Sequence, residues 1–306
     1  MAATDAPATT RRPTLEDLNL STGKRARLYD MLYHHGVGNG TLLCLPIDHG
    51  LEHGPRDFLV NPAAADPAFQ FELAIQGGYN AIACQIGFAE RYFPRFAGRV
   101  PLILKINGKT NIPSDADAHS PVTASVEDAV RLGAHAIGYT MYVGSPQQSR
   151  HFEDFRRVRQ DAERYGIPIV MWAYPRGSAV EEKGGRDCLY AVDYAARVAM
   201  ELGADVVKLN VPEKSDKDAD MPAKYRELEW DYAEGAARVT RSAQNTLVLF
   251  SGGSKVSDED LLEKGRLVME GGATGLIFGR NMWQRPMDEA LAVTRKVKAM
   301  FEDYGV

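Results

Sequence analysis

The chain has 306 residues, enough for one large α/β domain or two domains of average size. Its hydrophobic share of 44% and charged share of 25% are those of an ordinary globular protein. The formal charge of −5 argues against a global attraction to nucleic acid or to an anionic membrane, but it leaves room for a local basic pocket. No apolar run approaches the roughly 18 residues that span a membrane.

The N-terminal residues 1–13 are small, polar and punctuated by proline, and we predict that they form a mobile tail ahead of a single domain at residues 14–306. They lack the apolar core of a secretory signal, and Asp5 is poorly suited to an organelle transit peptide. The three cysteines are scattered and form no CxxC pair, which favours ordinary thiols over a disulfide framework or a zinc site. We therefore expect a cytoplasmic protein.

Short apolar runs alternate with amphipathic stretches along the chain. The runs are typical of parallel strands buried on both faces. The predicted strands lie at Leu42–Ile47, Ala81–Cys84, Leu102–Ile106, Ala136–Tyr139, Ile167–Trp172, Val206–Leu209, Leu247–Phe250 and Gly275–Phe278. The predicted helices lie at Pro67–Gln76, Ser125–Leu132, Gln147–Tyr165, Asp187–Leu202, Lys224–Ser242, Asp258–Glu270 and Met287–Phe301.

Strands that alternate with helices indicate right-handed βαβ units and a parallel sheet. About eight such units in about 300 residues is the count of a (β/α)8 TIM barrel, which is the α/β fold that we predict. The alternative is an open, doubly wound sheet. The turn after the first strand, Asp48–Gly54, lacks a G-x-G-x-x-G pattern, which weakens a dinucleotide-binding version of that alternative.

In a TIM barrel the active-site residues come from the C-terminal ends of the strands and from the loops that follow. Applied to this sequence, the rule selects polar residues, aromatic residues and glycines at most of the predicted strand ends. They are Asp48 and His49, Lys105 and Asn107, Tyr139, Trp172 and Tyr174, Lys208, Ser251-Gly252-Gly253-Ser254-Lys255, and Gly279-Arg280.

Lys208 interrupts the apolar run Val206–Leu209, which should form barrel wall. A lysine there must extend to solvent, pair with a carboxylate, or have a lowered pKa. Desolvation and a second nearby cation both favour the free amine, which attacks carbonyl carbon to give a Schiff base. We hypothesise that Lys105 is that cation. On spacing alone, a structural ion pair between Lys208 and a carboxylate remains an alternative.

The loops after the seventh and eighth strands commonly bind phosphate in TIM barrels. Here they carry Ser251-Gly252-Gly253 and Gly279-Arg280. Glycine lets backbone N–H groups approach phosphate oxygens, and Arg280 can add charge-assisted hydrogen bonds. Turns need glycine in any case, so the prediction of a phosphate site depends on the two loops being adjacent.

The run His49–His53 matches the H-x-x-E-H pattern of some zinc peptidases, which place both histidines on one helix face. Here the run directly follows a buried strand, and Gly50, Gly54 and Pro55 disfavour a helix. We therefore predict no metal site.

Taken together, these residues resemble the archaeal-type class I fructose-bisphosphate aldolase family. The resemblance is carried, in order, by LPIDHGLEHGP at 45–55, KINGKT at 105–110, GYTMYVGS at 138–145, WAYPRG at 172–177, DVVK at 205–208, SGG at 251–253 and GRNMWQR at 279–285. It implies reversible cleavage of fructose 1,6-bisphosphate to dihydroxyacetone phosphate and glyceraldehyde 3-phosphate, in glycolysis or gluconeogenesis, without a metal or other cofactor.

The resemblance also implies residue roles. Lys208 would be the Schiff-base lysine, Tyr174 the main proton-transfer residue, and Asp48 and Trp172 neighbours of the reacting carbons. The phosphate next to the ketone would be held by Ser251, Gly252, Gly253, Gly279 and Arg280, with His53 near the far phosphate. Trp172 and Tyr174 lie on the same face of the strand, so one of them could instead pack against the other without a catalytic role.

Sister enzymes of the same architecture act on other phosphorylated keto compounds, as transaldolase-like synthases or as thiolases, and remain alternatives. A phosphosugar-binding scaffold without catalysis is a further alternative. The expected partner is a small sugar phosphate rather than nucleic acid or a membrane, and the family implies a homo-oligomer.

Overall fold

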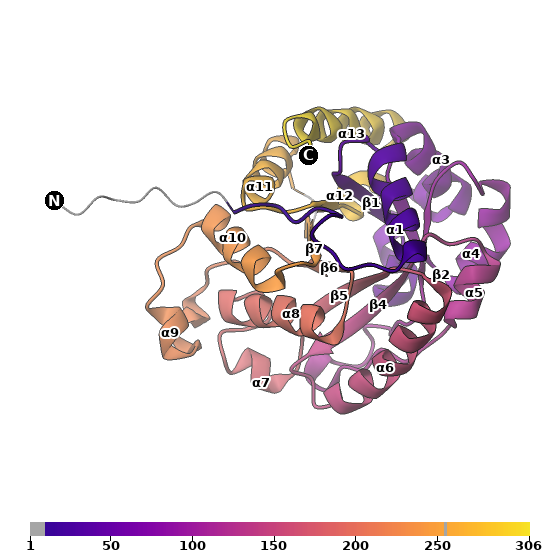
Figure 1. Cartoon of the computed structure of the whole chain (residues 1–306). Helices are drawn as coiled ribbons and strands as arrows, with labels where there is room; N and C mark the ends of the chain where they lie inside the picture. The colour runs from indigo at the N-terminus through magenta and orange to yellow at the C-terminus, as the bar shows by residue number, and fades with distance from the viewer. Residues whose placement is uncertain (1–9, 254–255) are drawn as a thin grey trace.

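The computed structural model describes residues 10–253 and 256–306, in which eight parallel strands close into a barrel in chain order (Figure 1). The strands are β1 Leu42–Pro46, β2 Ala81–Gln85, β3 Leu102–Lys105, β4 Ala136–Val143, β5 Ile169–Pro175, β6 Val206–Leu209, β7 Leu247–Ser251 and β8 Gly275–Ile277. Strand β1 pairs with both β2 and β8, so the sheet closes on itself. The predicted (β/α)8 barrel is confirmed, and the open-sheet alternative is wrong.

Helices surround the barrel (Figure 1). The longer ones are α1 Thr22–Tyr29, α3 Pro67–Gly77, α4 Ile86–Tyr92, α5 Val126–Arg131, α6 Gln148–Tyr165, α8 Leu189–Leu202, α10 Tyr232–Ala243, α11 Asp258–Glu270 and α13 Met287–Glu302. Single turns form α2 His49–Glu52, α7 Ser178–Glu181, α9 Ala223–Arg226 and α12 Arg280–Trp283.

The single helix predicted at Lys224–Ser242 is wrong, because two helices, α9 and α10, occupy that stretch. Asp231 begins α10 with a capping box: its carboxylate accepts a hydrogen bond from the Glu234 N–H, and Glu234 accepts one from the Asp231 N–H. Reciprocal capping of this kind satisfies two N–H groups that a helix start leaves unpaired. A continuous helix would lose both bonds.

The strands are buried on both faces and separate two apolar layers. Outward residues such as Val207 pack under the helices, whereas Val206 belongs to the inner cluster that fills the barrel. Successive strand side chains point to opposite faces. Lys208, two residues after Val206, therefore points to the barrel interior.

The N-terminal segment closes one end of the barrel. Leu15, Leu18 and Leu28 are buried in the inner cluster with Leu249 and Ile277 from the last two strands. The buried Lys24 ammonium fixes α1 by an ion pair with Asp205, with the Nζ 3.1 Å from Oδ2.

Part of the predicted tail, residues 10–13, is described, and Arg241 donates a hydrogen bond of 2.9 Å to the Thr10 hydroxyl. The rest of that tail, residues 1–9, lies outside the described residues. Within residues 10–253 and 256–306, no helix combines the length and apolar character that a membrane span requires.

Candidate active site

A cavity of about 680 Å³ opens where the C-terminal strand ends meet. Two of the strand-end candidates are not part of the cavity lining: Asn107 donates to the Ser120 and Thr140 carbonyls, and Tyr139 donates to the His151 carbonyl. All but one of the residues that were given a role in the site from sequence line the cavity: Asp48, His53, Trp172, Tyr174, Lys208, Ser251, Gly252, Gly253, Gly279 and Arg280. The exception, Lys105, lies directly behind the wall, with its ammonium 4.3 Å from the centre of the Trp172 ring. The closed barrel thus brings together residues that are up to 232 positions apart in the chain, from Asp48 to Arg280.

Lys208 lies on β6 opposite Trp172 of β5, and its side chain is buried. Its Nζ is hydrogen-bonded to the Tyr174 hydroxyl. Burial lowers the pKa of Lys208 to about 7, because the ammonium loses more hydration energy than the attraction of Asp48 and Glu52 restores. Repulsion by Lys105 and Arg280 lowers the pKa further. At neutral pH a large share of Lys208 is therefore the free, nucleophilic amine.

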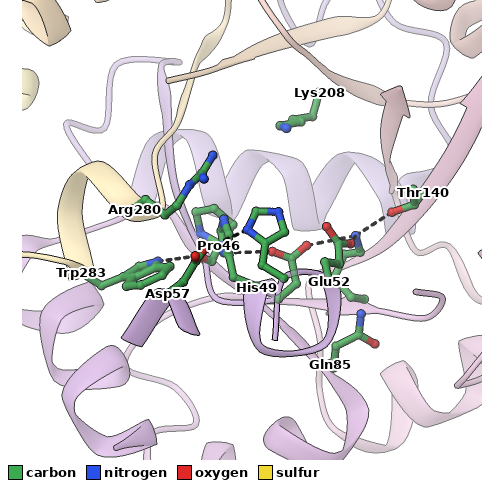
Figure 2. A network of polar contacts seen from close by, with 12 residues as sticks. Pro46, His49, Glu52, Asp57, Gln85, Thr140, Lys208, Arg280 and Trp283 are labelled. Carbon is green, nitrogen blue, oxygen red and sulfur yellow. Dashed lines mark hydrogen bonds and ion pairs between the residues drawn. The ribbon is translucent and has the colours of Figure 1, made fainter. Parts of the chain in front are cut away.

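The buried Lys105 ammonium is charged, and Figure 2 labels two of its partners, Glu52 and Thr140. Its Nζ donates to Asp48 Oδ2 at 3.1 Å, Glu52 Oε1 at 3.2 Å and the Thr140 hydroxyl at 2.8 Å. Burial opposes its charge, but Glu52 and Asp48 outweigh burial and raise its pKa. Lys105 is thus a fixed cation. It repels the Lys208 charge, as hypothesised from sequence, but desolvation is the larger cause of the lowered Lys208 pKa.

A glycine makes the stacking of Lys105 on Trp172 possible. A Cβ at Gly138 on β4 would lie 2.7 Å from Lys105 Cδ and 2.9 Å from Trp172 Cζ3. Any other residue at this position would displace both side chains. The stack fixes the indole on the cavity wall beside Lys208.

Asp48 and Glu52 both bind the Lys105 ammonium, but their pKa values are shifted in opposite directions. Burial opposes ionisation of Asp48, yet the Lys105 ammonium outweighs it, so the Asp48 pKa lies below its usual range. Burial raises the pKa of Glu52 despite the attraction of Lys105. The sequence reasoning did not select Glu52, whose contact with Lys105 joins residues 53 positions apart.

Two glycine-containing loops form one side of the cavity. The Ser251 hydroxyl donates to Asn210 Oδ1 at 2.8 Å, and Arg280 Nη2 donates to the Gly253 carbonyl at 3.3 Å. A Cβ at Gly252 would lie 2.6 Å from Phe278 Cδ1. The loops therefore need glycine for close packing as well as for access to backbone N–H groups. Ser254 and Lys255, which belong to the predicted motif, lie outside the described residues.

A second group of cations lines the cavity around Asp115. Lys109 Nζ lies 2.9 Å from Asp115 Oδ1, and Arg176 Nε and Arg186 Nη1 lie 3.0 and 3.9 Å from Oδ2. Burial opposes the Asp115 charge, but these cations lower its pKa. Sequence reasoning missed the three cations, although Lys109 and Arg176 closely follow predicted strands.

The H-x-x-E-H run does form one helical turn, α2, which corrects the expectation that its glycines would prevent a helix. Two of its side chains have other partners: His53 Nδ1 is 2.8 Å from Asp57 Oδ2, and Glu52 binds Lys105. Burial lowers the pKa of His49 to about 4 and keeps its imidazole neutral. In the described part of the chain, no group of three or more His, Cys, Asp or Glu side chains could hold a metal ion.

This arrangement of a buried amine, a phenol and basic loops in a parallel barrel has close counterparts. The model of the DeoC/LacD family of aldolases matches residues 42–285, which include every predicted site residue. The chain belongs to the DeoC/LacD aldolase family.

Individual members of this aldolase family are similar over most of their length. A class 1 fructose-bisphosphate aldolase of Thermoproteus tenax is 40% identical over 80% of this chain and 84% of its own, and one of Halobacterium salinarum is 38% identical over 81% and 86%. An archaeal fructose-1,6-bisphosphate aldolase structure, whose catalytic lysine is covalently bound to the carbinolamine intermediate, aligns with a TM-score of 0.77 at 36% identity, covering 89% of this chain and 98% of its own.

Proposed function

We propose that the chain is a class I fructose-bisphosphate aldolase that acts through a Schiff base on Lys208. The observation that carries this proposal is the buried Lys208 amine, with a pKa of about 7, hydrogen-bonded to Tyr174 in a cavity with cations on two sides. The class 1 aldolases of Thermoproteus and Halobacterium support it. The proposed residue roles rest on this geometry.

The reaction begins when the Lys208 amine attacks the C2 carbonyl of fructose 1,6-bisphosphate. Loss of water from the carbinolamine gives an iminium ion, which is an electron sink. The C3–C4 bond then breaks, and its electron pair moves into the iminium to give an enamine. In this scheme the iminium has the electron-withdrawing role that a metal ion has in metal-dependent aldolases, so no metal ion is needed.

Tyr174 transfers the proton of the C4 hydroxyl as glyceraldehyde 3-phosphate leaves: its oxygen takes that proton while its own phenolic proton passes to water in the cavity. Its hydroxyl is hydrogen-bonded to Lys208 Nζ, so it lies beside the atom to which C2 becomes attached. The enamine is then protonated at C3, and hydrolysis releases dihydroxyacetone phosphate. Trp172 and Asp48 limit the space around these carbons, and both are buried.

The two phosphates would occupy the two basic sides of the cavity. The loops of Ser251, Gly252, Gly253, Gly279 and Arg280 would hold the phosphate on C1, next to the ketone. His53 and the cluster of Lys109, Arg176 and Arg186 would attract the phosphate on C6. Cations at both ends favour a bisphosphate over the substrates with one phosphate that some sister enzymes use.

The test is mass spectrometry of the protein after incubation with dihydroxyacetone phosphate, borohydride and EDTA. We expect a reduced adduct on the Lys208 peptide and none on the Lys105 peptide, because the Lys105 ammonium already donates to three acceptors. Lys208→Met is the matched control and should give no adduct. Absence of an adduct, with cleavage abolished by EDTA, would contradict the proposal.

We also propose a cytoplasmic homo-oligomer. The three cysteines are buried free thiols, which suits a reducing compartment. The adjacent residues Leu59 and Val60 are 78% and 63% exposed in the isolated chain, which suits a contact with a second subunit. Light scattering during size-exclusion chromatography would measure the assembly, and a monomer at micromolar concentration would contradict it.

A further inference from the structure

The cluster formed by Asp48, Glu52 and Lys105 contains two carboxyl groups and one ammonium. It lies in the inner wall of the barrel, where Asp48 and Lys105 are at most 3% exposed and the Glu52 side chain, which borders the cavity, is 16% exposed. With both carboxyls ionised, the cluster would hold one uncompensated negative charge. Buried charge without a partner is costly, so one carboxyl should carry a proton whenever no second cation is near.

The contacts select Glu52 as the protonated group. Both carboxyls bind the Lys105 ammonium, but the Asp48 side chain is 3% exposed and the Glu52 side chain 16% exposed, and Lys105 is the one cation paired with Glu52 in the described part of the chain. The pKa of Glu52 is raised by burial, and that of Asp48 is lowered by Lys105 against the effect of burial. Of the two carboxyls, Glu52 is therefore the one that more readily holds a proton.

The reaction on Lys208 changes the charge that faces this cluster. The neutral amine becomes an iminium ion, which keeps a positive charge at any pH of the reaction. Electrostatic coupling between two groups is reciprocal: Glu52 raises the pKa of Lys208, and a cation on Lys208 lowers that of Glu52. Iminium formation therefore favours release of the Glu52 proton.

The charged groups that act on Glu52 come from three strands. Asp48 follows β1, Lys105 ends β3 and Lys208 lies on β6. Tyr142 of β4 stays a neutral phenol, because burial and then Glu52 raise its pKa. Among these groups, Lys208 alone gains a permanent charge during the reaction.

We propose that Glu52 is a positioning residue that stores a proton in the resting enzyme and releases it as the Lys208 iminium forms. Atoms and charge balance in this step: the Lys208 amine, the C2 ketone of the sugar and the Glu52 carboxylic acid give the iminium ion, the Glu52 carboxylate and water. The carbinolamine C–O bond breaks with its electron pair on the departing oxygen, which takes the Glu52 proton and leaves as water, and the nitrogen lone pair forms the C=N bond. The cluster becomes more negative by one charge as Lys208 becomes more positive by one, so the total charge of the cluster and Lys208 is unchanged. This proposal rests on the proposed aldolase function.

The experiment counts protons taken up when the iminium forms. The Tyr174→Phe variant lacks the group that accepts the C4 hydroxyl proton, so it should accumulate the iminium with fructose 1,6-bisphosphate. This variant and the double variant Tyr174→Phe/Glu52→Gln are mixed with the sugar in weakly buffered indicator solution between pH 6.5 and 8.5. The corresponding hexitol bisphosphate, which has no carbonyl, gives the background from binding alone.

We expect the double variant to take up more protons than Tyr174→Phe, by up to one per site, because glutamine has no proton to release. Glutamine keeps an acceptor for Lys105, so the melting temperature of the variant should change little. Equal proton uptake by the two proteins would overturn the proposal. If the double variant does not fold, the infrared difference spectrum of Tyr174→Phe decides: the protonated-carboxyl band must disappear as the iminium forms, and a persistent band overturns the proposal.

Borohydride trapping on the same samples separates this proposal from the proposed function. An adduct on Lys208 with equal proton uptake would remove the role of Glu52 and leave the aldolase intact. Absence of an adduct in the unsubstituted protein would contradict the aldolase mechanism itself.

Discussion

The lowered pKa of Lys208 predicts an unusual pH dependence of Schiff-base formation. The free amine is the reactive form, and its fraction depends on a pKa of about 7 instead of the ordinary 10.5. At pH 7.5 about three-quarters of Lys208 would be free amine, against roughly 0.1% at the ordinary pKa. Burial thus increases the reactive population by roughly 750-fold.

Between pH 6.5 and 9 the rate of adduct formation should rise only about fourfold and then level off, whereas an ordinary lysine would give about a 300-fold rise. The assay is single-turnover trapping with dihydroxyacetone phosphate and borohydride, quantified on the Lys208 peptide. The hexitol bisphosphate serves as a competitor to show that substrate affinity does not set the profile. A rate that keeps rising about tenfold per pH unit through pH 9 would refute the pKa argument.

Four further outcomes are expected. Lys208→Met should reduce cleavage of fructose 1,6-bisphosphate by at least about a thousandfold without lowering the melting temperature, since it removes the nucleophile and a desolvated amine; retained turnover would contradict this. Arg280→Ala should raise KM about tenfold or more while kcat changes less, because a charge-assisted phosphate contact is lost; unchanged KM would exclude that contact. The buried Asn80 side chain donates to the Met31, His35 and Thr41 carbonyls and accepts from Leu43 N, so Asn80→Ala should lower the unfolding free energy by about 3 kcal/mol in urea titrations. A loss below about 1 kcal/mol would mean that the site relaxes. Cleavage should be unchanged in EDTA, and inhibition restored by a divalent ion would contradict the Schiff-base scheme.

The strands and the chemical centre could be predicted from sequence because their signals are local. A lysine inside the apolar run Val206–Leu209 is conspicuous, and alternation along the strand shows that Lys208 points into the barrel. The predicted end of the fourth strand, Tyr139, was too early, since β4 continues to Val143. The polar Thr140 and the large Tyr142 hide that extension, although both are buried.

The remaining site residues could not be predicted because their roles arise from contacts between distant segments. Glu52 belongs to a misleading H-x-x-E-H run, and nothing in that run indicates that its carboxylate meets Lys105. The cationic cluster depends likewise on Asp115, whose loop brings Arg176 and Arg186 together. Such a cluster becomes visible only when the barrel is closed.

The N-terminal closure of the barrel has a consequence for biosynthesis. Leu15 and Leu18 leave the ribosome more than 200 residues ahead of Leu249 and Ile277, with which they share the inner cluster. Until the final strands emerge, these leucines have no complete packing site. The nascent chain must therefore keep an apolar segment exposed for most of translation, and pairing of such distant segments is slow. Aggregation during expression, rather than loss of the native state, is the step at which substitutions in this segment should act first.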